Sequence, residues 1–437
     1  MKRWLRNDFF KDLIKGSVTL LTGSMGGALL GLAILSLTLK GIGAEWYGIY
    51  IVVLTYTEIF DQLFNFQSWL ALVKLGANEL ESGRREHFCQ YLKIAFYFDV
   101  STSSVGAVFA LVFAGLIGNY LAWEPFQILL ARLYALWIVT HVVGMPIGTL
   151  RLLGEYSYIA RHRIISSAFR LCLILIAFLF HADEIIFIYC LLCSEIVDNL
   201  LLYFIALYRL RRHGFGGWHK AKIDWKQFWN FFRFGIWTNI ETTLNLPVSK
   251  FDKIIISKMF SYEIVSVYKF FDKFAQIIRK ILSSLIYVLF PEFSKSNARN
   301  QMSEVYRNSV RLGIMVLLFG IPLWIVFSFT SFFWVGPLFS ETFVKYIPHL
   351  ILFIGFRTLS AAFVSLEPIL ISQGFLKFRF TVNVSSSIVF YACLFAFGFK
   401  MGLLGFILSG IIMETYKITV KLIVLTARKN KTKPAAD

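Results

Sequence analysis

The stretch from Leu312 to Trp334, LGIMVLLFGIPLWIVFSFTSFFW, contains no charged residue. As an α-helix it is long enough to cross the hydrocarbon core of a bilayer, which takes about 20 residues. The whole chain has a similar character, because 57% of its 437 residues are hydrophobic and 16% are charged, against about 45–50% and 25% in soluble domains. So much apolar surface does not fit into one core. We therefore expect lipid to be the second solvent.

Further stretches of similar length and hydropathy occur along the chain. Together they predict an all-α integral membrane protein with about twelve transmembrane helices and no water-soluble domain. The expected spans are 16–39, 46–73, 92–118, 126–148, 164–182, 184–208, 231–257, 263–290, 312–334, 347–372, 381–399 and 402–426.

Basic residues are distributed unevenly between the connections of these spans. One side holds basic clusters in the regions 2–11, 74–85, 151–163, 209–226, 295–311, 377–379 and 428–433. The other side holds little beyond Lys40, Lys258, Lys345 and Lys400. The positive-inside rule makes the first side cytoplasmic and places both termini there. The net charge of +18 is then mainly topological, with contact to anionic headgroups, and does not indicate nucleic-acid binding.

The two halves of the chain resemble each other. The segment Glu45–Tyr50 opens the second expected span, and Glu263–Tyr268 opens the eighth in a similar way. With six helices each, the halves would share orientation and be related by an axis along the membrane normal, as in many transporters. The expected division is an N-terminal lobe (1–213), a cytoplasmic linker (214–229), a C-terminal lobe (230–427) and a basic tail (428–437).

Ionisable residues occur inside the spans, where each is costly and usually faces a cavity or a partner. In the eighth span, polar residues recur every three or four positions from Lys269 to Lys280, which predicts a polar helix face. Basic residues outnumber acidic ones there, so a diphosphate, which binds ammonium and guanidinium groups well, would balance them. The candidate substrate-binding residues are Lys250, Lys253, Lys269, Lys273, Arg279, Lys280, Arg357 and Arg132. The alternative is mutual pairing, of Asp272 with Lys269 or Lys273 and of Asp252 with Lys253.

Acidic residues at the same depth are candidates for ion coupling. Glu58 and Asp61 lie within the second span, where a proton or Na⁺ could bind. Glu241, Asp252 and Asp272 are the further candidates. Cys190 and Cys193 form a C-x-x-C inside an apolar helix and are interpreted as packing residues. We therefore expect neither a metal site nor a cofactor, apart from the coupling ion.

Three local motifs carry a family resemblance: Gly41–Tyr50 at an outer turn, Phe251–Ile256 at the end of the seventh span, and Leu289–Ser294 after the eighth. With the topology, they resemble the polysaccharide-transporter branch of the multidrug/oligosaccharidyl-lipid/polysaccharide exporter superfamily, which includes the Wzx-type O-antigen flippases. Ser266 departs from the glycine that is common at this position in the family.

This resemblance implies a V-shaped pair of six-helix lobes that alternates between inward- and outward-open states in the bacterial inner membrane. The implied substrate is an undecaprenyl-diphosphate-linked oligosaccharide for O-antigen, capsule or exopolysaccharide, carried from the cytoplasmic to the periplasmic leaflet as an ion-coupled antiporter. Implied partners are membrane lipids and the machinery for polymerisation and chain length.

Three alternatives remain open. A multidrug exporter of the same superfamily shares the topology, but buried lysines would repel its cationic substrates. A lipid II flippase of the related branch typically has two further helices, for which this chain has no room. A membrane-embedded polysaccharide polymerase or ligase would need a sizeable external loop. The external connections, such as Asn119 to Pro125 and His181 to Glu184, are short, so we do not expect an enzyme.

Overall fold

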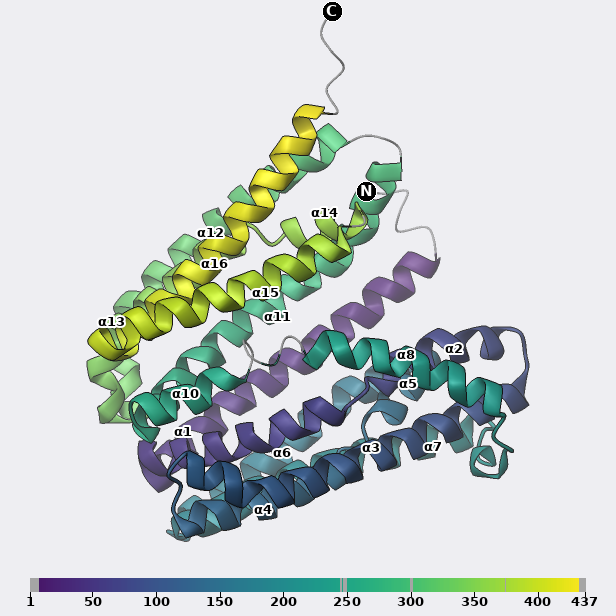
Figure 1. Cartoon of the computed structure of the whole chain (residues 1–437), viewed down its shortest axis with the longest axis horizontal. Helices are drawn as coiled ribbons and strands as arrows, with labels where there is room; N and C mark the ends of the chain where they lie inside the picture. Colours follow the sequence, from purple (N-terminus) through teal and green to yellow (C-terminus); the bar gives the residue numbers. More distant parts are fainter. Residues whose placement is uncertain (1–7, 244–245, 247–249, 299–301, 374, 432–437) are drawn as a thin grey trace, which may run out of the picture. The chain divides into compact units, whose positions relative to one another are not determined.

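The computed structural model describes residues 8–243, 246, 250–298, 302–373 and 375–431. Every regular element in these ranges is a helix (Figure 1). The chain divides into two compact units, Met1–Val265 and Ser266–Asp437. Each is described below by itself. The expected all-α fold is therefore confirmed for the described residues, whereas the lobe boundaries at 213 and 230 stay predictions.

Unit 1 covers the N-terminal half of the chain and extends beyond it to Val265. Its helices are α1 (Asp8–Phe64), α2 (Ser68–Glu81), α3 (Arg85–Tyr120), α4 (Pro125–Thr140), α5 (Gly144–Leu152), α6 (Tyr156–Leu179), α7 (Glu184–Arg212), a 3₁₀ turn η1 (Trp218–Lys220), α8 (Trp225–Thr243) and α10 (Phe251–Met259). Helix α11 (Tyr262–Ala298) begins in this unit and continues into the next.

The first two expected spans form one element with a kink. Gly43, at φ 76° and ψ 173°, bends α1 between them. A residue with a side chain rarely adopts this conformation, so glycine is required here. Helices α1 and α6 pack side by side because α1 presents glycines to α6. A Cβ on Gly23 would lie 2.7 Å from the Cα of Ala160.

Three expected spans of unit 1 are each divided between two helices. The span 46–73 stops at Phe64, and its last residues belong to α2. The span 126–148 is divided into α4 and α5 by residues 141–143. Likewise 231–257 gives α8 and α10, and residues 244–245 and 247–249 between them lie outside the described ranges. Each span was predicted from its continuous apolar composition, and composition does not reveal where the helical backbone is interrupted.

Unit 2 holds the remaining helices. They are the rest of α11, α12 (Met302–Leu338), the 3₁₀ turn η2 (Glu341–Tyr346), α13 (Ile347–Ala361), α14 (Leu366–Ser372), α15 (Leu376–Cys393), the π-helical turn η3 (Leu394–Gly398) and α16 (Phe399–Lys431). The expected span 347–372 is divided between α13 and α14. Gly402, at φ 57° and ψ −134°, kinks α16 near its start.

The exposed surfaces of these helices suit lipid. Within the described residues, seven helical stretches are long and apolar enough to cross a membrane. Leu21–Glu81 has 61 residues and Lys377–Thr426 has 50; at 1.5 Å per residue, each exceeds twice the bilayer core of about 30 Å. On α12, Phe319, Phe329 and Phe333 are 74%, 72% and 80% exposed. The protein is therefore a multi-pass membrane protein.

Within unit 1, a mainly aromatic core packs α8 against α2 and α3. Leu72 of α2, Phe88 and Phe98 of α3, and Phe231 of α8 are almost completely buried in one cluster. The rings of Phe98 and Phe231 meet edge to face with centroids 5.6 Å apart, a favourable aromatic geometry. The core thus holds α8 against α2 and α3.

Outside the spans, Glu155 fastens the start of α6 to the end of α7. Its carboxylate accepts hydrogen bonds from Arg209 and from His213, whose Nε2 lies 2.9 Å from Oε1. Burial raises the pKa of Glu155, but these hydrogen bonds outweigh it, so the pKa lies below its ordinary value. The stabilisation is therefore present at neutral pH and is lost as the pH falls through the lowered pKa.

We predict that Glu155→Gln lowers the free energy of unfolding by roughly 1 kcal/mol at pH 7, because the partners are partly exposed. The difference from wild type should shrink below about pH 4.3, where glutamate protonates. Thermal unfolding of the purified protein across this pH range measures it. Glu81→Gln, at an exposed glutamate, is the control. An E155Q difference that does not change with pH would contradict the assignment.

Candidate functional site

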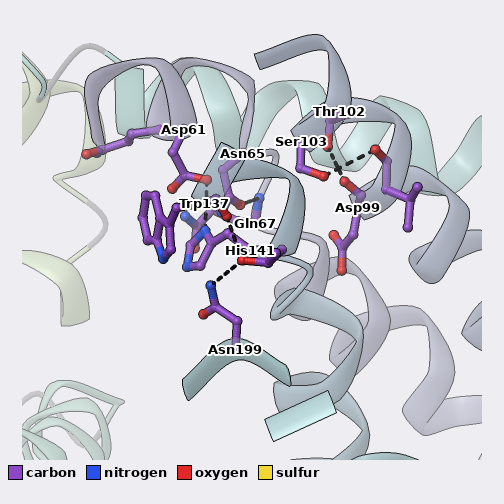
Figure 2. Close-up of polar contacts among 12 residues, drawn as sticks. Asp61, Asn65, Gln67, Asp99, Thr102, Ser103, Trp137, His141 and Asn199 are labelled. Carbon is purple, nitrogen blue, oxygen red and sulfur yellow. Dashed lines mark hydrogen bonds and ion pairs between the residues drawn. The ribbon is translucent and has the colours of Figure 1, made fainter. Parts of the chain in front are cut away.

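Two helix interruptions meet inside unit 1. Helix α1 ends at Phe64 and α2 begins at Ser68, while α4 ends at Thr140 and α5 begins at Gly144. Figure 2 shows Asp61, Asn65 and Gln67, which lie at or near the first interruption, together with His141 from the second. An interruption frees backbone groups that have no water to bind inside a bilayer. Each must therefore find a partner within the protein.

Helix α8 supplies partners for the first interruption. The Nδ2 of Asn239 donates to the carbonyl oxygens of Leu63 and Asn65 at 3.0 and 3.1 Å. The hydroxyl of Thr238 donates to the carbonyl of Phe66 at 2.9 Å. Gln67 has a left-handed backbone, with φ 51° and ψ 45°, and its N–H donates to Asn65 Oδ1 at 3.1 Å. The broken end of α1 is thus closed by polar side chains.

Asp99 of α3 closes the second interruption. Its carboxylate accepts a 2.7 Å hydrogen bond from the backbone N–H of Met145, in the first turn of α5. A negative charge is favourable there because the N-terminus of a helix is positive. Gly144 makes the approach possible, since a Cβ there would lie 1.8 Å from Ser68 Oγ and 2.9 Å from Asp99 Oδ2.

A histidine–carboxylate pair lies where the two interruptions meet. Oδ1 of Asp61 is 2.8 Å from Nδ1 of His141, and Figure 2 shows the two side chains pointing toward each other. The indole of Trp137 stacks on the imidazole, with centroids 4.9 Å apart. Thr140 directly precedes His141, and its hydroxyl oxygen accepts a hydrogen bond from Nδ2 of Asn199 of α7 at 3.2 Å. The pair is therefore fixed by α1, α4 and α7.

The sequence singled out Asp61 but not His141. The seven histidines are scattered, and this one follows α4 at a position 80 residues from its partner. Only its place within an apolar span gave a signal, because a histidine at membrane depth usually marks function.

Several predicted site residues of unit 1 pair with one another. Lys250 Nζ lies 2.5 Å from Glu58 Oε2, which joins a substrate-binding candidate to an ion-coupling candidate. Lys253 Nζ lies 3.0 Å from Asp252 Oδ1, as the alternative interpretation expected. Arg132 is exposed on α4 and lies beside Gly115 of α3. Glu241 belongs to α8, but its side chain lies outside the described part of the chain.

The other predicted residues belong to unit 2. On α11, Asp272 binds Arg279 at 2.7 Å and Gln276 at 2.9 Å. Lys269, Lys273 and Lys280 are partly buried on the same helix. The structure thus places Lys269, Asp272, Lys273, Arg279, Lys280 and Arg357 in one unit and the remaining predicted residues in the other.

Three helices of unit 2 meet around Tyr268 of α11. Its ring lies 6.2 Å from that of Phe353 on α13 and 4.8 Å from that of Phe406 on α16. At 3.6 residues per turn, Arg357 lies one turn beyond Phe353, and Lys417 lies three turns beyond Phe406 on the same face. Both cations therefore lie beyond the aromatic contact, on the faces that meet there.

Sequence analysis missed Lys417 and a neighbouring ion-pair network. Glu367 of α14 accepts hydrogen bonds from Lys421 of α16 and from Arg379 of α15, whose Nε lies 2.7 Å away. Lys417 precedes Lys421 by one helical turn. It interacts electrostatically with Glu414, Lys421, Arg357 and Glu367. Its position within the expected span 402–426 was the available signal.

The chain belongs to the family described as polysaccharide biosynthesis protein, which matches residues 13–297. This confirms the resemblance found in the sequence. Among curated proteins, the inner membrane protein YghQ of Escherichia coli (strain K12) is 24% identical over 212 residues, which is 48% of this chain. The match spans 60% of the length of YghQ.

Solved structures of one transporter superfamily share the fold. The lipid II flippase MurJ in an inward closed conformation matches with a TM-score of 0.73 at 14% identity, over 94% of this chain and 87% of MurJ. An inward-facing multidrug resistance transporter of the MATE family and the MOP superfamily matches with a TM-score of 0.69 at 11% identity, over 95% and 100%. At these identities the likeness concerns the fold alone.

We predict that Asn239→Ala destabilises the protein by about 1–3 kcal/mol, because it leaves partly buried carbonyls at the end of α1 without this donor. Thermal unfolding in detergent measures the change. Asn230→Ala is the matched control, since Asn230 is exposed on the same helix. Equal stability of the two variants would show that Asn239 does not hold the interruption.

Proposed function

We propose that this protein is a flippase. It moves undecaprenyl-diphosphate-linked oligosaccharides from the cytoplasmic to the periplasmic leaflet of the bacterial inner membrane by ion-coupled alternating access. Both termini face the cytoplasm. The cargo would serve O-antigen, capsule or exopolysaccharide synthesis, which places polymerisation and chain-length proteins downstream.

The observation that carries this proposal is the charge of unit 2 at span depth. Between Tyr268 and Leu282 of α11, on α13, and from Gly402 to Lys417 of α16, the acids are Asp272 and Glu414. The bases in the same segments are Lys269, Lys273, Arg279, Lys280, Arg357 and Lys417. An excess of positive charge on partly buried side chains at this depth favours an anionic ligand. A diphosphate offers several oxygens to ammonium and guanidinium groups at once.

The family and the fold support the same class of activity. The matching family is described by polysaccharide biosynthesis, and one structural neighbour is described as a lipid II flippase. A polyprenyl chain can remain in lipid while only the charged head needs a polar path. The cations of α11, α13 and α16, together with Lys250, Lys253 and Arg132, are the proposed head-group residues. Glu58, Asp61, Glu241, Asp252 and Asp272 are the proposed ion-coupling residues.

Drug export and catalysis fit the structure less well. The basic excess of unit 2 repels the cationic substrates of a multidrug exporter. The turns between α3 and α4 and between α6 and α7 contain only residues 121–124 and 180–183, too few for an external catalytic platform. We therefore propose transport without a chemical step.

Deleting the gene tests the proposal. Complete repeat units on the polyprenyl carrier should accumulate facing the cytoplasm, and surface glycan should be lost. Unchanged glycan together with greater sensitivity to cationic drugs would favour drug export and overturn the proposal.

Complementing the deletion with Lys269→Ala or Lys273→Ala should restore protein but little surface polysaccharide. One charge-assisted contact contributes about 1.5–3 kcal/mol, or roughly 10- to 100-fold in rate or affinity. Lys400→Ala, at an exposed lysine near the start of α16, should restore polysaccharide fully. Normal polysaccharide in both test variants would remove these lysines from the head-group site.

A further inference from the structure

We propose that the coupling ion is a proton and that the pair Asp61–His141 binds it. This inference rests on the proposed function and adds to it the chemical identity of the ion and the residue that receives it. One proton adds to the imidazole to give an imidazolium paired with the Asp61 carboxylate, and later leaves to the other side. No other bond forms or breaks.

The helix geometry favours a positive charge at this position. Asp61 lies in the last turn of α1, and His141 directly follows the last residue of α4. The C-terminal end of a helix is negative, so both helices stabilise an imidazolium between them. A carboxylate at such an end is unfavourable by itself, which strengthens the demand for a cationic partner. The ends of α1 and α4 thus form a binding site for one proton.

The other charges around His141 are already compensated. Asp99 of α3 and Glu195 of α7 act on it electrostatically, as Asp61 does. Asp99 accepts a hydrogen bond from the N–H of Met145 at the positive N-terminal end of α5, which stabilises its carboxylate. Glu195 is bound by Arg170 of α6 at 2.8 Å. The remaining acid nearby on α1, Glu58, is paired with Lys250. Among these groups, histidine is the side chain whose ordinary protonation equilibrium lies in the physiological range, so we place the proton on His141.

The donor atoms favour a proton over Na⁺. A hard cation needs several oxygen ligands, and carboxylate or carbonyl oxygens suit it better than an imidazole nitrogen. Here one Asp61 oxygen is directed at Nδ1 of His141. Histidine is the side chain whose ordinary protonation equilibrium lies in the physiological range. A proton therefore fits this pair without rearranging its ligands.

Asp61 lies on the last turn of α1, and this turn also binds α8. Gln62, next to Asp61, donates to the carbonyl of Thr242 at 3.4 Å, and Asn239 binds the carbonyl of Leu63 at 3.0 Å. A change of charge at Asp61 therefore acts directly on the end of α1 that anchors α8. Since α8 begins the expected C-terminal lobe, proton binding would bias its attachment to the N-terminal helices.

Flipping in proteoliposomes tests the inference. The probe is undecaprenyl diphosphate carrying a fluorescent oligosaccharide, and its leaflet is read from quenching by an external reductant. A pH gradient should accelerate flipping by wild-type protein, up to about tenfold per pH unit, while a Na⁺ gradient at constant pH should not. His141→Gln should make the flipping rate independent of the pH gradient.

His162→Gln is the matched control. His162 forms another histidine–carboxylate pair, 3.2 Å from Asp198, but it lies within α6 and not at an interruption. This variant should keep the pH response. If His141→Gln does not fold, Asp61→Asn tests the same pair. A pH dye inside the liposomes also counts protons moved by wild-type protein during flipping, with about one proton expected per lipid.

The outcomes separate the inference from the proposed function. A Na⁺-driven response, an unchanged pH response in H141Q and D61N, or no proton movement by the wild type would overturn the proton site while flipping stands. Absence of flipping by the wild type under every gradient would instead overturn the proposed function.

Discussion

The structure depends on one constraint: inside a bilayer, every backbone N–H and C=O must find a partner within the protein. A continuous helix without internal proline satisfies it without help. The ends of α1 and α4 do not satisfy it alone. Asn239, Thr238 and Asp99 form hydrogen bonds with the backbone groups at the two interruptions. The polar residues of unit 1 gather at these two ends because the backbone requires them there.

The same polar residues create the conditions for function. Once α1 and α4 end inside the protein, their negative termini lie beside Asp61 and His141, and a site for a cation results from the fold itself. Unit 2 differs in its charge. Two of its acids, Asp272 and Glu367, are bound by basic partners, and α11, α13 and α16 carry more bases than acids at span depth. In this account, the proposed proton site lies in unit 1, and most of the proposed head-group residues lie in unit 2.

The sequence predicted the membrane class, the helices and the family because apolar length and local motifs are properties of single segments. It did not predict the interruptions. No proline or glycine marks residues 65–67, and the groups that stabilise this interruption come from α8, far along the chain. Residues 141–143 are followed by Gly144 and Pro146, a signal of a helix break that the expected span 126–148 did not take into account. The candidate site was predicted only in part, because the partners of its residues also come from distant parts of the chain. A carboxylate within an expected span can be recognised in the sequence, as Asp61 and Glu58 were, but its partner depends on which helices pack together. His141, and the pairing of Lys250 with Glu58, follow from tertiary structure alone.

The central claim is that the protein recognises a polyprenyl lipid by its diphosphate. Native mass spectrometry of the purified protein tests it directly, with undecaprenyl diphosphate, undecaprenyl monophosphate, undecaprenol and a lipophilic phosphonium cation offered in competition. The account predicts that the diphosphate lipid is retained most strongly and that undecaprenol is retained least among the three lipids. Equal retention of the uncharged lipid, or preference for the cation, would contradict it.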